Sequence, residues 1–396
     1  MKKKARKLSP LSEYPLVSLR TILERAHAPL KQDVMKSALP SGSLHLFISI
    51  SDGHSRAQTH NFKGGSFEAA WSDIIIWANK FDPSHEVRWL RIEWVSEIIK
   101  ISWLQLHGVL GKVKRNYFRY GISLNEDFRN AFLEQELNAN AMLYLGAEHD
   151  TAGLNEKNFI SYGRQKYGQR FTLPEGSDHN IWLFTTSGLF FQSNHEPVKL
   201  NPFCGDVEGR DTGRRCVSDL NEEILKDVVR KASNFLANQV NQDGKFTYGL
   251  HPCFDREINT YNTLRHTSTL YSMLEAWDVT RDSELKRAID RGISYLTKKL
   301  LRNYKLADGE DATFLLDLNN EIKLGGNAVC LLALVKYTEL TGEKKYLPLM
   351  EKIASGIKFL QDDKTGQFFH VLHSSDLSVK EKFRIIYYDG EAAFGL

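Results

Sequence analysis

The sequence of 396 residues has few cysteines, no long apolar run and no excess of charge of either sign. Its four cysteines are too sparse for a disulfide scaffold, and no apolar run reaches the roughly 18 residues that crossing a bilayer requires. Lys and Arg number 52 against 49 Asp and Glu, a net charge of +3 that is too balanced for an electrostatic nucleic-acid binder. Five basic residues stand among the first seven, but no apolar segment follows, which argues against a secretory signal. We therefore expect a cytoplasmic protein without a membrane span and without a nucleic-acid partner.

The chain also has little in its first 200 residues that identifies a common enzyme class. We find no Walker loop, no dinucleotide-binding fingerprint and no Gly-x-Ser-x-Gly elbow there. Overall, 42% hydrophobic and 26% charged residues are ordinary for a globular protein, and the length suits two or three domains.

The first 200 residues mix strand and helix patterns. Leu90, Ile92 and Trp94 alternate with charged residues, which indicates a half-buried strand, and Ser66 is a suitable N-cap for an amphipathic helix over 67–80. We expect further strands at 44–50, 120–124, 180–186 and 189–192, the last two paired around Ser187-Gly188, and a helix over 128–143. These patterns predict an α+β domain over residues 1–200. The order strand, helix, strand, then Gly121-Ile-Ser-Leu124 and Phe132-Leu-Glu-Gln-Glu-Leu137, is similar to that of AMMECR1-like domains, although their cysteine motif is missing here.

The second half of the chain repeats itself. Gly292-Ile-Ser-Tyr-Leu296 recurs 64 residues later as Gly356-Ile-Lys-Phe-Leu360, and Asp243-Gly-Lys-Phe246 matches Thr365-Gly-Gln-Phe368. Each copy reads as an inner helix, a short turn with Asp282 or Gly342, an outer helix and a loop that ends in Gly-x-Phe. We expect an all-α helical-hairpin domain over 219–396, joined to the first domain by a polar linker at 201–218.

This pattern of helical hairpins resembles the (α/α) toroids of the six-hairpin glycosidase class. Their relatives include sugar epimerases, polysaccharide lyases and lanthionine cyclases, so the resemblance implies an architecture more than a reaction. A closed toroid has about six hairpins, whereas this sequence supplies about two and a half and stops inside an expected inner helix. We therefore expect the apolar side of this helix, with Ala393, Phe394 and Leu396, to need cover from a homo-oligomer, a partner subunit or further residues.

The starts of the inner helices form the predicted site. In a toroid these ends converge on one mouth, where backbone N–H groups and helix dipoles favour polar and anionic ligands. The repeat register places Arg265, Asn327 and Glu391 at related positions, one on each inner helix. The candidates are Tyr261, His266 and Glu391 for catalysis, and Arg265, Asn327, Tyr387, Tyr388 and Asp389 for substrate binding. The alternative is that the tyrosines pack the rim and Arg265 forms a structural ion pair with Glu391.

Three functions remain open at this point. The first is a carbohydrate-active enzyme that acts on a sugar or glycan by hydrolysis, elimination or epimerisation, without a cofactor, in surface polysaccharide metabolism. The second is a non-catalytic scaffold that docks a partner through the open toroid edge. The third is a zinc-dependent peptide-modifying enzyme of the cyclase type, whose metal ligands would be Cys204, Cys216, His251 and Cys253.

Overall fold

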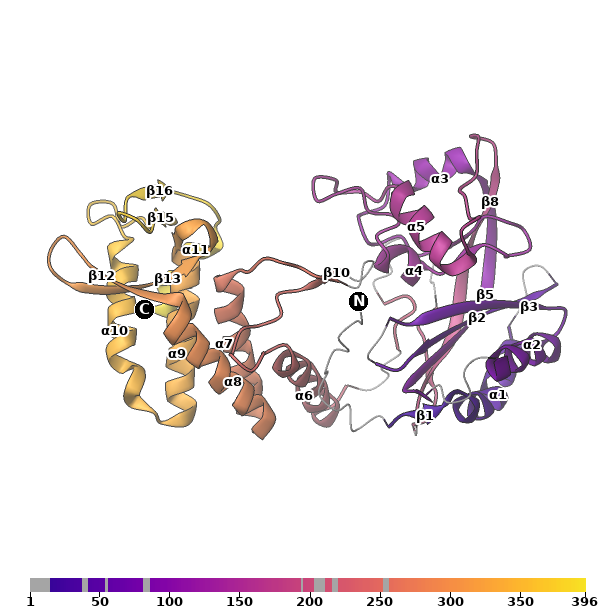
Figure 1. The fold of residues 1–396 in the computed structure, drawn as a ribbon, viewed down its shortest axis with the longest axis horizontal. Helices are drawn as coiled ribbons and strands as arrows, with labels where there is room; N and C mark the ends of the chain where they lie inside the picture. The colour runs from indigo at the N-terminus through magenta and orange to yellow at the C-terminus, as the bar shows by residue number, and fades with distance from the viewer. Residues whose placement is uncertain are drawn as a thin grey trace. The chain divides into compact units, whose positions relative to one another are not determined.

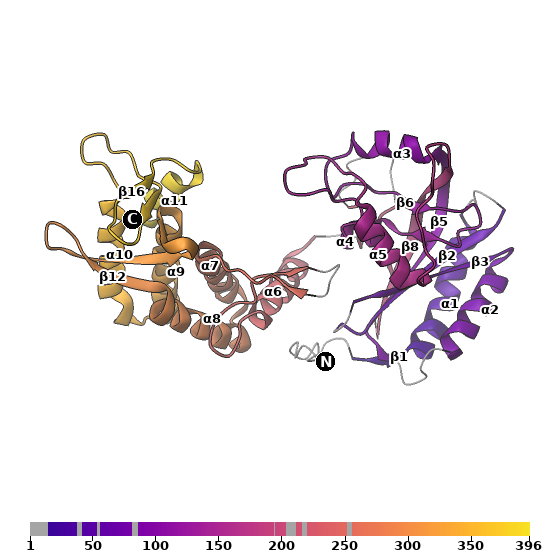
Figure 2. The same ribbon diagram turned by 45° about the horizontal axis from the view of Figure 1, so that its top comes forward.

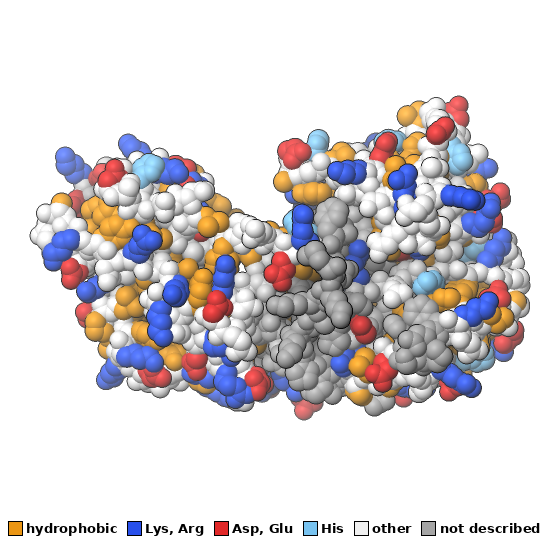
Figure 3. All heavy atoms as spheres, viewed as in Figure 1, with side chains coloured by type: hydrophobic (Ala, Val, Ile, Leu, Met, Phe, Trp, Pro, Cys, Tyr) orange, Lys and Arg blue, Asp and Glu red, His pale blue; other side chains and the backbone are white. Residues whose placement is uncertain are grey.

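The computed structural model describes residues 15–37, 42–53, 56–80, 86–193, 195–202, 211–215, 220–251 and 256–396. The chain divides into two compact units (Figure 1). The N-terminal unit comprises Met1–Ser218 with His251–Arg256, and the C-terminal unit comprises Asp219–Leu250 with Glu257–Leu396. Within the described ranges, every helix is too short or too polar to traverse a lipid bilayer. Figure 3 shows basic and acidic side chains interspersed over the face that it draws, as the small net charge predicts.

The N-terminal unit is built around an antiparallel sheet with the strand order β3-β2-β5-β8-β6-β7, in which β9 also pairs with β8. Its strands are β2 (Leu44–Ser51), β3 (Gln58–Gly64), β5 (Trp89–Ser102), β6 (Gly121–Ser123), β7 (Ala131–Phe132), β8 (Asn180–Gln192) and β9 (Val198–Lys199), while β1 (Val17–Ser18) pairs with β4 (Glu86–Val87). The helices are α1 (Leu19–Met35), α2 (Phe67–Lys80), α3 (Trp103–Leu110), α4 (Glu134–Ala139) and α5 (Glu156–Tyr167).

The alternation in β5 sorts its side chains between the two faces of this sheet. Leu90, Ile92 and Trp94 pack into the core beneath α1 and α2, which lie side by side on one face (Figure 2). Ser66 accepts a hydrogen bond from the backbone of Ala69 (3.2 Å), so it caps α2 as expected.

Two sequence-based expectations for this unit are wrong. The helix expected over 128–143 is only α4, because Phe128 and Ala141 have φ of +60° and +53°, which a helix does not tolerate. The two strands expected around Ser187-Gly188 are one continuous strand, β8. Gly188 is needed there for close approach rather than for a turn, since a Cβ on it would lie 2.7 Å from Cγ of Glu93.

Most of the C-terminal unit is helical. Its helices are α6 (Glu222–Asn238), α7 (Thr263–Thr280), α8 (Ser283–Tyr295), α9 (Leu324–Thr341), α10 (Leu347–Phe359) and α11 (Tyr387–Gly395). A π-helical turn (Leu296–Leu300) extends α8, and 3₁₀ turns occupy Leu318–Asn320 and Lys344–Tyr346. The expected hairpins are present. Asp282 caps α8 by accepting the N–H of Leu285 (2.8 Å), and Gly342 ends α9 with φ +73°.

The expectation that this unit is all-α is wrong, because it also contains an antiparallel sheet of five strands. These are β12 (Leu301–Lys305), β13 (Asp311–Asp317), β14 (Glu321–Lys323), β15 (Val371–His373) and β16 (Val379–Glu381), paired in sequence order; β10 (Leu250–His251) and β11 (Arg256–Glu257) form a separate pair. Asp308-Gly309, with φ +89° at the glycine, turns the chain between β12 and β13. Residues 312–315 of β13 are all buried, so both faces of this part of the strand are covered, and the strand packs against α10.

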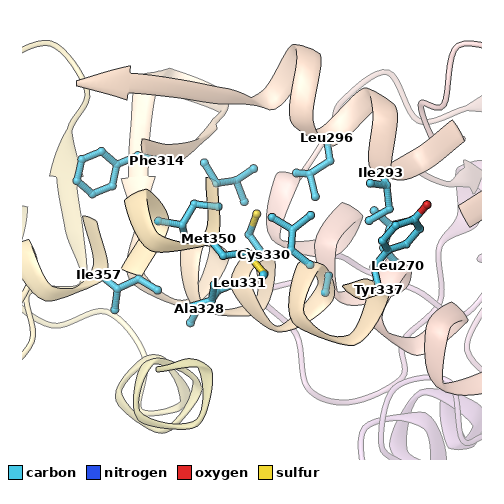
Figure 4. Close-up of a cluster of buried hydrophobic side chains, with 14 of the residues drawn as sticks. Leu270, Ile293, Leu296, Phe314, Ala328, Cys330, Leu331, Tyr337, Met350 and Ile357 are labelled. Carbon is cyan, nitrogen blue, oxygen red and sulfur yellow. The ribbon is translucent and has the colours of Figure 1, made fainter. Parts of the chain in front are cut away.

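Helix α9 is the centre of the C-terminal unit. It packs against α7, α10 and α11, and its apolar residues are buried nearly all round the helix. Figure 4 shows Cys330 and Leu331 of α9 among side chains from the neighbouring elements. The repeated glycine has a physical reason: a Cβ on Gly292 would lie 2.6 Å from Leu270, and one on Gly356 would lie 2.8 Å from Phe314. The repeat therefore marks where each outer helix approaches its neighbours most closely.

Candidate functional site

The starts of α7 and α9 are tied together by one acidic residue at the end of β13. Oδ1 of Asp317 accepts the N–H of Thr263, the first residue of α7, at 3.1 Å. Its other oxygen, Oδ2, lies 2.6 Å from Nζ of Lys323, which precedes the first turn of α9. The side chain of Asp317 is 5% exposed, so this pair holds two inner-helix starts in a fixed relation.

Glu321 connects the same region to the segment that leads into α11. Its carboxylate lies 2.6 Å from Nζ of Lys380, 3.1 Å from Nη1 of Arg384 and 3.1 Å from Nζ of Lys323. Hydrogen bonds from Arg384 lower the pKa of Glu321 to about 2. In Figure 1, β15, β16 and α11 lie together at the end of α9 where that helix begins.

Glu391 occupies the position that the repeat register predicts, against the first turn of α9. A Cβ on Gly325 would lie 2.1 Å from its Oε2, so only glycine leaves room for the carboxyl group. This Oε2 is buried and has no hydrogen-bond partner in the described part of the chain. Burial raises the pKa of Glu391, which favours a protonated carboxyl group that can donate a hydrogen bond.

Tyr388 lies one turn before Glu391 and faces the same helix start. Its Cδ1 would be 2.5 Å from a Cβ on Gly325, and the residue is buried, with an exposed fraction of 7%. The charges of Lys323, Arg384 and Glu391 act on its hydroxyl, and burial raises its pKa. Among the described residues the hydroxyl has no hydrogen-bond partner. The ring edge of Tyr388 and the carboxyl group of Glu391 thus lie beside the same residue of α9, Gly325.

Asp389 and Tyr387 do not share the environment of Tyr388 and Glu391 beside the first turn of α9. Asp389 accepts a hydrogen bond from Nε2 of buried His370 at 3.1 Å, and Nδ1 of His370 accepts the N–H of Arg384 at 2.9 Å. This chain of bonds anchors the beginning of α11 to the strand segment. Tyr387 is 66% exposed, so its ring is available to a ligand.

Tyr261 and His266 form a bonded pair inside the protein. The hydroxyl of Tyr261 lies 2.7 Å from Nδ1 of His266, whose Nε2 lies 3.2 Å from the carbonyl of Gly292 in α8. The proton of His266 is therefore assigned to Nε2, and Tyr261 donates to Nδ1 while accepting the N–H of Phe246 at 3.2 Å. Burial lowers the pKa of His266 to about 4 and raises that of Tyr261 to about 12. The pair joins α7 to α8, which favours a positioning role.

Arg265 and Asn327 do not lie in equivalent environments, although the repeat register relates them. Arg265 is exposed, with its guanidinium 5.9 Å from the ring centroid of Tyr248, and the ion pairs of the described residues do not include one with Glu391. Asn327 is fully buried. It accepts the N–H of Leu315 at 2.7 Å and donates to the carbonyl of Lys323 at 2.9 Å, so its amide holds strand and helix together.

The suggested zinc ligands fall mostly outside the described residues. Cys204, Cys216 and Cys253 are not among them, and the described ranges contain no cluster of three or more potential metal ligands. His251 lies in β10.

Asp317, Glu321 and Lys323 lie at these helix starts but are not among the candidate residues that the sequence predicted. The only signal was an acidic and a basic residue two apart directly before the Gly325-Gly326 helix start.

No family model matches the chain, and no curated protein matches it. Among solved structures it is similar to a D-mannose isomerase, at 18% identity and a TM-score of 0.34, over 40% of this chain and 41% of that one. It is also similar to a cellobiose 2-epimerase from Bacillus thermoamylovorans, at 12% identity and a TM-score of 0.32, over 61% of this chain and 65% of that one. The chain thus spans less than two thirds of the length of either enzyme. The similarity of its first half to AMMECR1-like domains stays a prediction.

Proposed function

We propose that the C-terminal unit binds a sugar or glycan where α7, α9 and α11 begin, and catalyses proton transfer on it. The observation that carries this proposal is the pair formed by Glu391 and Tyr388. One is a carboxyl group with a buried, unpartnered oxygen and a raised pKa, and the other has a hydroxyl without a partner among the described residues. The raised pKa of Glu391 favours its protonated form, and a protonated carboxyl group can act as a general acid.

The surrounding residues supply the other requirements of such chemistry. The charges of Lys323 and Arg384 stabilise negative charge that develops on the hydroxyl of Tyr388 or on a substrate oxygen. The exposed ring of Tyr387 offers an apolar face for a sugar ring, and exposed Arg265 can bind a carboxylate or hydroxyl group. Hydrolysis, elimination and epimerisation all use an acid and a tyrosine or carboxylate to donate and accept protons. Surface polysaccharide is the substrate class to test first.

In this proposal the remaining predicted residues position the site. Asp389 fixes the start of α11 through His370, and Asn327 fixes the start of α9 through the backbone of Leu315 and Lys323. Tyr261 and His266 would act on the reaction only through the placement of α7.

The test is turnover on a panel of neutral and acidic glycans, with Glu391→Gln compared with Glu351→Gln. Glu351 is an exposed glutamate of α10, so its variant controls for the loss of one carboxylate. We expect Glu391→Gln to lower kcat by roughly 10²–10⁴-fold with a small change in KM, and Glu351→Gln to leave both unchanged. Activity should fall at high pH as Glu391 loses its proton. No turnover on any glycan, together with unchanged glycan binding in Arg265→Ala, would overturn the proposal.

The scaffold function remains as a second candidate because of the exposed side chains of α11. Phe394 is 70% exposed and Leu396 is 62% exposed, so two large apolar side chains of this segment lie at the surface. Ile386, just before the helix, is 72% exposed. A scaffold would bury these residues in a second copy or a partner subunit. Light scattering and hydrogen exchange of residues 387–395 would test this: a monomer whose α11 exchanges rapidly in cell extract as well as alone contradicts it.

A further inference from the structure

A cavity of about 390 Å³ lies in the N-terminal unit, beside the end of α5. Its volume falls within the range of roughly 300–1,000 Å³ that is usual for small-molecule sites. Its walls come from two segments, 124–130 and 167–174, and from His179. Neither segment belongs to the helix starts described above, and the cavity lies wholly within the first of the two units.

Buried hydrogen bonds hold the wall between the two segments in place. The hydroxyl of Tyr167 donates to the carbonyl of Ala131 at 2.5 Å and accepts the N–H of the same residue at 3.0 Å. The adjacent Lys166 lies 2.8 and 2.9 Å from the two carboxylate oxygens of Glu136 and 3.0 Å from the carbonyl of Ala131. The side chains of Lys166 and Glu136 are 7% and 5% exposed. A wall fixed in this way loses little conformational entropy when a ligand binds.

Three of the polar side chains that line the cavity keep hydrogen-bonding groups available to a ligand, whereas the Tyr167 hydroxyl and the His179 ring are bonded within the protein. Among the described residues, neither the guanidinium of Arg170 nor the side-chain amide of Asn130 takes part in a hydrogen bond or ion pair. Asn125 accepts the backbone N–H of Asn130 at 2.8 Å through its Oδ1, which leaves its NH₂ group to a ligand. Leu173 and Pro174 add a half-buried apolar surface beside these groups.

The chemistry of this lining selects one kind of ligand. A guanidinium binds a carboxylate through two parallel hydrogen bonds. Amide groups both donate to and accept from hydroxyls, which suits a polyhydroxylated ring. Of the described lining residues, Arg170 alone carries a permanent positive charge, so the cavity matches one carboxylate better than a phosphate or a diphosphate.

We propose that this cavity binds a single acidic sugar of the hexuronate class. The carboxylate lies on Arg170, the ring hydroxyls bond to Asn125 and Asn130, and the apolar edge of the ring rests on Leu173. This is a binding site separate from the helix starts of the C-terminal unit, and it does not depend on the function proposed for them.

Calorimetry and ligand-observed NMR on the full chain test the proposal, with glucuronate as the probe and glucose and inorganic phosphate as comparators. We expect saturable binding of glucuronate, and at least tenfold weaker binding of both comparators. Arg170→Gln should weaken glucuronate binding by about tenfold or more, because it removes a charge-assisted contact. Arg20→Gln, which changes an exposed arginine of α1 on another part of the unit, should bind as the wild type does.

Two further variants separate this site from the helix starts and from general effects on folding. Glu391→Gln should bind glucuronate unchanged at this site, even where it abolishes turnover. Arg170 is exposed, so its variant should keep the wild-type melting temperature. Glucose or phosphate binding as tightly as glucuronate, wild-type affinity in Arg170→Gln, or no binding of glucuronate at millimolar concentration would each overturn the proposal.

Discussion

Acidification should destabilise the C-terminal unit through His266. Burial lowers the pKa of this residue from 6.5 to about 4, and its exposed fraction is 2%. Below pH 6.5 the unfolded chain takes up a proton at this residue, whereas the folded chain stays neutral until about pH 4. The contribution of neutral His266 is therefore fully present above pH 6.5, is lost progressively as the pH falls from 6.5, and is gone below about pH 4. At about 1.4 kcal/mol for each pKa unit, it amounts to about 3 kcal/mol.

The measurement is hydrogen exchange by mass spectrometry in increasing denaturant, at pH values between 7 and 4.5, on peptides from residues 263–280. The comparison is His266→Phe, which keeps a ring beside Phe246 and Tyr295 but cannot take up a proton. The variant should be less stable at pH 7 because it loses two hydrogen bonds, yet it should lose about 2–3 kcal/mol less than the wild type on acidification.

The N-terminal unit provides an internal control for this experiment. Burial also lowers the pKa of His45 there to about 4, so peptides from residues 44–51 should become less protected over the same pH range in both proteins. Equal pH dependence of residues 263–280 in the wild type and in His266→Phe would refute the assignment of His266 as a buried neutral residue. The imidazole of His266 would then be free to ionise in the folded protein, as a catalytic histidine must.

Two further predictions concern the start of α9. Gly325→Ala should lower kcat and the melting temperature, because its Cβ meets the Glu391 carboxyl group at 2.1 Å, whereas Gly390→Ala in α11 has open space and should leave both unchanged or raise the melting temperature. Equal effects of the two alanines would contradict the packing described. Asn327→Ala should lower the free energy of unfolding, measured in denaturant, by about 2–4 kcal/mol. The reason is that the N–H of Leu315 and the carbonyl of Lys323 lose the bonds that the amide makes to them. A loss under about 1 kcal/mol would show that water replaces the amide.

The sequence predicted the helical hairpins because local physics repeats there. The glycine of each outer helix is required by close packing, at Gly292 against Leu270 and at Gly356 against Phe314, and such a requirement is visible as a repeat. Asp282 and Gly342 are ordinary capping residues, and they cap as expected. Features that depend on spacing along one helix could thus be predicted without a structure.

The two errors in the N-terminal unit have a different origin. Apolar spacing over 128–143 fits a helix, but the left-handed backbone at Phe128 and Ala141 breaks it, and nothing in an apolar pattern reports φ. At Gly188 the residue type was interpreted as a turn, although the constraint is the side chain of Glu93 on the neighbouring strand. The Gly188 constraint is a contact between segments far apart in the sequence, which a single sequence does not display.

The missed sheet and the missed site residues of the C-terminal unit have one cause. Glu391 and Tyr388 follow from the helix register, and the structure places both against the start of α9. Asp317, Glu321 and Lys323 come from β13 and β14, so they cannot be found by a scheme that assigns this segment to a loop between helices. The strands are what bring acids and a lysine to the helix starts, where the unpaired N–H groups and the helix dipole act on them. The helices of this unit therefore supply the frame and the two candidate side chains, Tyr388 and Glu391, and the sheet supplies charged residues beside them. Substitution of Asp317 or Lys323 should therefore change the placement of the starts of α7 and α9 together with the charge beside them, because Asp317 bonds to both.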